Sequence, residues 1–156
     1  MKKTDHIIVG QGIAGTVLAL ELINQGKSVV VIDDPALSTC SKVAAGIYNP
    51  IVFKRLTQSW IAEMAFPVMF DFYAEVEAKL GVRLLNPVKI ARLFSNADEE
   101  ALLKKKSLNE LNEFIDGAVH DDLIFSKDHY AYVKQAGYLD VPKFLEVSRI
   151  FFERKN

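Results

Sequence analysis

The chain has 156 residues, of which 50% are hydrophobic and 25% are charged, and its formal net charge at pH 7 is -1. This composition is typical of a soluble globular protein and lacks the basic footprint expected for nucleic-acid binding. The first apolar run is too short for a secretory signal or a membrane span, and the single cysteine, Cys40, excludes an internal disulfide. We therefore expect a cytoplasmic protein that binds neither nucleic acid nor membrane.

The first 32 residues follow the pattern of a strand, a helix and a second strand. Residues 6–9 and 28–32 are short apolar runs, which are typical of strands buried on both faces of a parallel sheet. Between them, apolar residues recur at near-helical spacing over residues 13–25, and Gly26 follows as a helix stop signal. The sequence therefore predicts a βαβ unit.

Three glycines, Gly10, Gly12 and Gly15, form the motif G-x-G-x-x-G at the predicted turn from strand to helix. Gly10 permits the tight turn, Gly12 admits a pyrophosphate close to the backbone, and Gly15 lets the helix pack closely on the strand. The phosphates would lie on unpaired amides at the positive end of the helix dipole, so Ile13 and Ala14 belong to the expected site. The alternative is a glycine-rich turn in an unrelated α/β protein.

An acidic residue ends the second predicted strand. Asp33 follows Gly15 by 18 positions, where a carboxylate can accept hydrogen bonds from both ribose hydroxyls of an adenosine. Its charge would repel a 2′-phosphate, which disfavours NADP. We give the neighbouring Asp34 a minor place in the site and expect it to point to solvent or to cap the turn at Pro35. These features predict dinucleotide binding but do not separate NAD from FAD.

A segment of small residues follows at 41–46, in place of the crossover helix that normally continues a nicotinamide dehydrogenase. Ala44, Ala45 and Gly46 leave the backbone exposed for contact with a large, flat group. The alternative is a surface turn that uses small residues. We expect the adjacent Cys40 to be buried or half-buried and not a nucleophile.

Three segments together resemble a known family. G-Q-G-I-A-G at 10–15, Asp33 and S-K-V-A-A-G at 41–46 resemble the D-amino acid oxidase and glycine oxidase-like family of FAD-dependent oxidoreductases, and A-G-Y-L-D-V-P-K-F-L at 136–145 is a weaker match. The resemblance implies FAD as the cofactor and oxidative deamination or demethylation of a small amine or amino acid. It implies that five residues of the second segment line the ribityl and isoalloxazine part of FAD: Ser41, Lys42, Ala44, Ala45 and Gly46.

The middle of the chain predicts one long helix and several shorter elements. Residues 58–80 carry apolar side chains four apart, which predicts a helix whose apolar stripe is core and which kinks or breaks at Pro67. The stripe is Trp60, Met64, Val68, Phe72, Val76 and Leu80. The further expected elements are a strand at 88–94, a helix at 98–114, antiparallel strands at 123–125 and 130–133, and a helix at 141–152 with Pro142 in its first turn.

The expected fold is α/β: an incomplete Rossmann-like FAD/NAD(P)-binding domain with part of an antiparallel β substrate domain. We place the FAD-binding domain at residues 1–80, the partial substrate domain at 81–140 and a returning helix at 141–156. Family members are longer, so the resemblance implies that this chain is an N-terminal portion. An unfinished parallel sheet leaves an apolar face uncovered, through which the chain is able to form a homodimer.

The sequence assigns no catalytic residue. Five side chains are candidates to face a substrate carboxylate, although residues of these types more often pack in the core or face solvent. They are Tyr48, Lys54, Arg55, Tyr130 and Tyr132. The three histidines, His6, His120 and His129, are scattered, so we expect no metal site. Two alternatives stay open: an NAD-binding oxidoreductase, and a non-catalytic dinucleotide-binding or interaction module.

Overall fold

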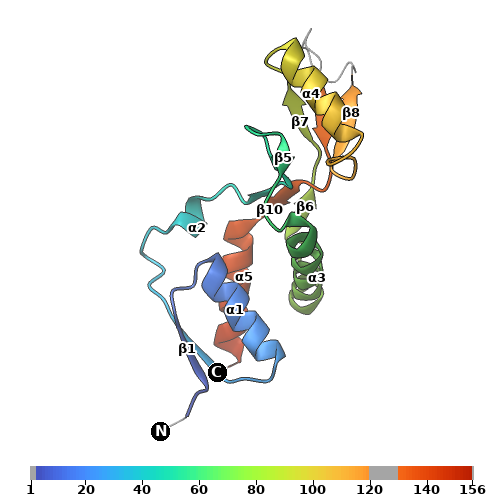
Figure 1. Ribbon diagram of the computed structural model, residues 1–156. Coiled ribbons are helices and arrows are strands. Elements are labelled where there is room, and N and C mark those ends of the chain that lie inside the picture. Colours follow the sequence, from blue (N-terminus) through green and yellow to red (C-terminus); the bar gives the residue numbers. More distant parts are fainter. Residues whose placement is uncertain (1–2, 120–129, 156) are drawn as a thin grey trace. The chain divides into compact units, whose positions relative to one another are not determined.

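The computed structural model describes residues 3–119 and 130–155 (Figure 1). Packing divides the chain into two compact units, each assembled from segments that are far apart in the sequence. Unit 1 comprises Met1–Gly46, Val76–Leu84 and Leu139–Asn156, and unit 2 comprises Ile47–Glu75 and Leu85–Tyr138.

Unit 1 contains the predicted βαβ unit. The strands β1 (His6–Val9) and β2 (Val29–Ile32) pair in parallel along their whole length, and α1 (Ile13–Asn24) connects them. The helix contacts both strands and buries Ala19 and Leu20. Apolar spacing and the glycine stop signal were therefore sufficient to place all three elements.

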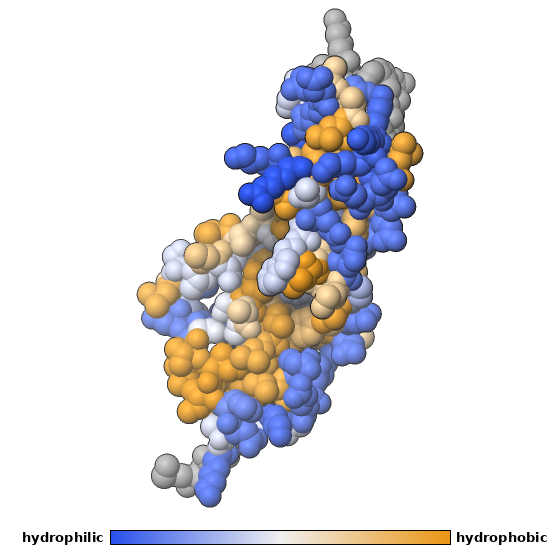
Figure 2. All heavy atoms as spheres, viewed as in Figure 1, coloured by the Kyte–Doolittle hydropathy of each residue, from blue (hydrophilic) through white to orange (hydrophobic). Residues whose placement is uncertain are grey.

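The expected burial of both sheet faces is wrong for these strands. Side chains alternate between the two faces of a strand, and the parallel register places four apolar residues on one face. Ile7 and Val9 are 63% and 81% exposed, and Val30 and Ile32 are 42% and 54% exposed. The physical reason is that α1 covers the other face, where Ile8 is buried, and that the described residues provide no second layer. We call these four residues the uncovered face; Figure 2 shows hydrophobic residues gathered over β1.

A C-terminal helix completes unit 1. α5 (Val141–Arg154) lies beside α1 and contacts α2 (Cys40–Val43) (Figure 1). Its amide at Lys143 donates to the carboxylate of Asp140, which caps the helix, and proline occupies the first turn. The prediction of a helix at 141–152 is confirmed. The expected burial of Cys40 is wrong, because its side chain is exposed at the start of the short helix α2.

The long predicted helix is α3 (Ala62–Leu80), and it begins later than expected. It continues through Pro67 as one element, although this proline lies inside the helix and cannot donate a backbone hydrogen bond. Val76 is buried as predicted, whereas Trp60, Met64 and Val68 are exposed. The predicted core stripe is therefore wrong for its first half, over which the described part of unit 2 places no layer.

Unit 2 consists of short antiparallel strands and one further helix. A three-stranded sheet has the order β3-β10-β6, a hairpin pairs β4 with β5, and a second three-stranded sheet has the order β7-β9-β8. The bounds are β3 (Ile47–Tyr48), β4 (Ile51–Val52), β5 (Thr57–Gln58), β6 (Leu85–Pro87), β7 (Ile90–Leu93), α4 (Ala97–Ser107), β8 (Ile115–Val119), β9 (Tyr130–Val133) and β10 (Gly137–Leu139). The strands predicted near 90 and 130 are confirmed, and the one predicted at 123–125 lies outside the described residues.

The helix predicted at 98–114 ends early, at Ser107. The side chains of Ser107 and Asn109 donate to the carbonyls of Lys104 and Lys105, which satisfies acceptors at the end of the helix without another turn. The residues that follow turn inward, and Leu111 and others fill the core of unit 2. This core contains Ile51, Leu56, Leu103, Leu111, Phe114, Ile115, Ala131, Val133 and Ala136.

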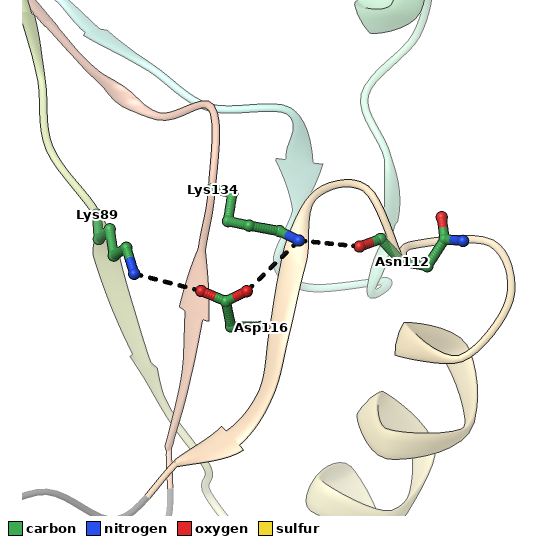
Figure 3. A network of polar contacts seen from close by, with 4 residues as sticks. All are labelled: Lys89, Asn112, Asp116 and Lys134. Atoms are coloured by element: carbon green, nitrogen blue, oxygen red, sulfur yellow. Dashed lines mark hydrogen bonds and ion pairs between the residues drawn. The ribbon is translucent and has the colours of Figure 1, made fainter.

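A small polar network lies on the sheet β7-β9-β8 (Figure 3). Asp116 of β8 forms ion pairs of 3.4 Å with Lys89 and with Lys134, and Lys134 also donates to the carbonyl of Asn112 at 3.1 Å. All these side chains retain contact with solvent, so each pair contributes at most about 1 kcal/mol. The network supports the sheet and shows no feature of a binding site.

Candidate cofactor site

The glycine turn between β1 and α1 has the geometry that its sequence predicts. Gly10 adopts φ 96°, a left-handed conformation that side chains disfavour. A methyl group at Gly15 would overlap the carbonyl oxygen of Gly10, so the helix approaches the strand more closely than any other residue permits. Gly10 and Gly15 thus have the roles in folding that the motif assigns to them.

The start of α1 presents free backbone donors. Gly12 is the N-cap and offers no side-chain acceptor, and the amide of Ile13 donates to Ser41 Oγ at 3.1 Å. The amides of Ala14 and Gly15 lack an intrahelical acceptor and have no other partner among the described residues. Together with the helix dipole, these donors form a place for an anion such as a diphosphate.

Asp33 lies beside this turn, at the end of β2. Its Oδ1 accepts a hydrogen bond of 2.9 Å from the amide of Gln11, which fixes the carboxylate against the glycine motif. Its Oδ2 has no hydrogen-bond partner among residues 3–119 and 130–155. Asp33 also lines a cavity of about 620 Å³ that runs along the edge of β2. One oxygen is therefore held and the other is open to a ribose.

The residues after Asp33 form a stabilised turn. Asp34 Oδ1 accepts a hydrogen bond from the amide of Ala36 at 2.9 Å, as expected for a residue that caps the turn at Pro35. Lys42 Nζ donates to the carbonyls of Pro35 and Leu37, both at 2.6 Å. The ammonium of Lys42 is thus directed to the turn, and its expected contact with the flavin stays a prediction.

The small-residue segment at 41–46 begins as the one-turn helix α2 and then becomes extended. Ala44 and Ala45 are exposed, which leaves their backbone accessible as predicted. Gly46 adopts φ 70° and accepts a hydrogen bond of 3.0 Å from the amide of Leu139. A methyl group at Gly46 would overlap the carbonyl oxygen of Leu139, so this end of the segment is fixed against the start of α5.

Sequence reasoning missed the role of Gln11. This side chain is only 7% exposed; its Nε2 donates to the carbonyl of Leu145 at 3.0 Å and its Oε1 accepts from Arg149 Nε at 3.2 Å. Gln11 therefore connects the glycine turn and Asp33 to α5. The only signal in the sequence is a polar residue within an otherwise small and apolar motif.

The five candidates for a substrate carboxylate do not form one cluster. The ring of Tyr48 packs edge-on against Phe66 and Phe70, Tyr130 is buried, and Tyr132 packs edge-on against Tyr130. Lys54 and Arg55 are exposed at the end of the β4-β5 hairpin. Their expected contact with substrate stays a prediction.

The described residues hold no group of three or more side chains suited to a metal ion. His6 is exposed, and His120 and His129 lie outside the described residues. None of the helices in the described parts of the chain has the length and apolar character needed to cross a membrane.

The site therefore combines a glycine turn with unpartnered amides, an acid with one open carboxylate oxygen and an accessible small-residue segment. A family model described as FAD dependent oxidoreductase matches residues 5–147. The chain belongs to this family. The match confirms the resemblance inferred from the glycine motif, Asp33 and the segment at 41–46, and FAD is the cofactor that the family uses.

Several solved structures have the same fold as this chain. Glycine oxidase from Bacillus cereus ATCC 14579 is 22% identical with a TM-score of 0.68, and the match covers 94% of this chain and 42% of that one. L-amino acid deaminase from Proteus vulgaris is 14% identical with a TM-score of 0.71, covering 96% and 38%. Glycine oxidase from Geobacillus kaustophilus is 17% identical with a TM-score of 0.71, covering 95% and 44%. The predicted mixed α/β fold is confirmed, and the chain spans less than half the length of these proteins.

The residues of unit 1 fit the adenosine diphosphate half of FAD. The unpartnered amides of Ala14 and Gly15 suit the diphosphate, and the open oxygen of Asp33 suits a ribose hydroxyl. The exposed backbone of Ala44 and Ala45 suits the approach of a flat ring system. The fit thus rests on donors and acceptors that the fold leaves unused.

Proposed function

We propose that this chain provides the FAD site of an oxidoreductase that oxidises the carbon next to the nitrogen of a small amine or amino acid. The observation that carries the proposal is Asp33, whose carboxylate is held at one oxygen by the glycine turn and open at the other. This arrangement suits an adenosine ribose, and the family match makes FAD the dinucleotide concerned.

FAD bound at this site would supply a two-electron acceptor for the hydride that leaves the carbon beside the amine. The residues of this chain hold the cofactor: the amides of Ala14 and Gly15 bind the diphosphate, and Asp33 binds the ribose. Ser41, Ala44, Ala45 and Gly46 line the remainder in our proposal. No described side chain is assigned to the reacting carbon.

The names of the structural neighbours support the substrate class. They are glycine oxidase, L-amino acid deaminase and iminodiacetate oxidase, the last from Chelativorans sp. BNC1 with 14% identity and a TM-score of 0.67. All three names refer to small molecules that carry both an amine and a carboxylate. We therefore propose the same class for this protein.

The proposal is tested by adding substrates to the FAD-loaded protein without oxygen. Glycine, a set of L-amino acids and iminodiacetate should be tried, and at least one should bleach the flavin absorbance. Air should then restore the absorbance and produce hydrogen peroxide. If the protein binds FAD but no amine bleaches the flavin absorbance, the result favours a non-catalytic dinucleotide-binding module instead.

The uncovered face supports a proposal of self-association. Ile7, Val9, Val30 and Ile32 form a contiguous apolar surface on one side of the β1-β2 sheet, and water disfavours such a surface. A homodimer that joins two of these faces would remove it from water. Light scattering should then give twice the chain mass, and Val9→Asp should restore the mass of one chain. The proposed location is the cytoplasm.

A further inference from the structure

We propose that Lys42 is a positioning residue, whose ammonium holds the segment after Asp33 in the shape that presents this acid to the adenosine ribose. The inference rests on the proposed function, because it assigns Lys42 a task in the same cofactor site. It differs from the role that the family resemblance implies, in which Lys42 lies along the flavin half of FAD.

The contacts of the ammonium support this assignment. Lys42 Nζ donates to two backbone carbonyls, those of Pro35 and Leu37, at 2.6 Å each. An ammonium has three donors, so two of them are used on the turn. The amide of Leu37 in turn donates to the carbonyl of Asp34 at 3.2 Å. Lys42 therefore closes the turn that begins at Asp34, directly after the ribose-binding acid Asp33.

The position of Lys42 on α2 explains how the turn is held relative to the glycine motif. Oγ of the preceding residue, Ser41, accepts a hydrogen bond of 3.1 Å from the amide of Ile13, which anchors α2 to the start of α1. Consecutive residues of a helix diverge by about 100° around its axis, so one turn can direct two neighbouring side chains to different partners. Ser41 thus anchors α2 to the diphosphate side, and Lys42 extends from it to the ribose side.

This arrangement leaves the ammonium engaged with uncharged backbone oxygens. Within the described residues, Lys42 forms no ion pair with a carboxylate. A lysine that held the turn by hydrogen bonds would act on cofactor affinity at any ionic strength. A lysine that attracted the diphosphate through its charge would lose its effect as salt screens the interaction.

The experiment compares Lys42→Met with the unmodified chain in titrations with ADP and with FAD. Loss of the two hydrogen bonds should weaken the binding of ADP and of FAD by the same factor, about tenfold, because both ligands contain the adenosine ribose. Lys42→Arg, which retains several donors, should recover most of the affinity. Lys143→Met is the matched control: it removes a lysine bond to a carbonyl, that of Arg83 at 3.1 Å, elsewhere in unit 1. The affinity of Lys143→Met for ADP and for FAD should equal that of the unmodified chain.

A second measurement needs no ligand. In hydrogen exchange of the free protein, the amide of Leu37 should exchange faster in Lys42→Met than in the unmodified chain, because its turn is no longer closed. The amide of Thr16, which lies within α1, should exchange at the same rate in both proteins. Equal exchange at Leu37 would overturn the inference.

The titrations separate the possible failures. If Lys42→Met lowers the affinity for FAD but not for ADP, Lys42 lies at the flavin. If its loss of affinity disappears in high salt, Lys42 acts on the diphosphate through its charge. Either outcome overturns the inference and leaves the proposed function standing. Loss in Asp33→Asn with none in Lys42→Met also overturns only the inference. An unmodified chain that binds neither ADP nor FAD overturns the proposed function as well.

Discussion

Gly15→Ala is expected to destabilise the chain by about 3 kcal/mol or more, as overpacking against backbone does. The added methyl group would overlap the carbonyl oxygen of Gly10, which belongs to the backbone and has little freedom to move. Relief would need α1 to separate from β1, and this would uncover Ala19 and Leu20, which are both buried. Urea denaturation followed by circular dichroism measures the change.

Gly26→Ala is the control for this substitution. Gly26 also has a positive φ, 75°, but nothing lies within 4 Å of the added methyl group. Only the conformational cost remains, which is about 1 kcal/mol. A loss of stability for Gly15→Ala no greater than that for Gly26→Ala would show that close packing of helix on strand is not the reason for this glycine.

Asp33→Asn is expected to weaken FAD binding by about 2 kcal/mol, or roughly thirtyfold. The amide keeps the shape of the side chain and an oxygen for the Gln11 amide, but it loses the charge that strengthens a hydrogen bond to a ribose hydroxyl. Quenching of flavin fluorescence during titration with FAD gives the affinity.

Asp34→Asn serves as the neighbouring control. In the described structure the side chain of Asp34 accepts only the local hydrogen bond from the amide of Ala36, and asparagine retains that acceptor. FAD affinity should therefore change by less than about threefold. Equal losses for Asp33→Asn and Asp34→Asn would indicate a general effect of negative charge on the turn and not a specific bond to the ribose.

The parts of the site that the sequence predicted are those set by local chemistry. Gly10 requires a positive φ, and Gly15 requires the absence of a side chain; both requirements are visible in the spacing of the motif. Asp33 was equally predictable, because the end of a strand fixes where its side chain lies relative to the preceding turn. The strand, helix and acid depend on neighbours within about one βαβ unit.

The parts that were missed depend on contacts between distant residues. Gln11 is buried against α5, more than 130 positions later in the sequence. The carbonyl of Leu145 and the side chain of Arg149, both on α5, form hydrogen bonds with the side-chain amide of Gln11. The ammonium of Lys42 donates to the carbonyls of Pro35 and Leu37, and the residues next to Lys42 in the sequence do not indicate these partners. Polar side chains of this kind have no periodic pattern that marks their partner.

Burial was also harder to predict than periodicity. The spacing of Met64 and Val68 correctly places them on one side of a helix, yet both are exposed, and the exposed Trp60 lies before the helix begins. Likewise, the apolar runs of β1 and β2 predicted strands correctly and burial incorrectly. An apolar residue indicates that a surface is suited to packing against another element. It does not indicate whether the described residues provide that element.

We propose that the glycine turn and Asp33 together bind the adenosine diphosphate of FAD. Calorimetric titration of the unmodified chain with FAD and, separately, with NAD tests it most directly, with ADP added as a competitor. We expect FAD to bind more tightly than NAD and ADP to displace the bound FAD. Tight binding of NAD with none of FAD, or bound FAD that ADP does not displace, would contradict it.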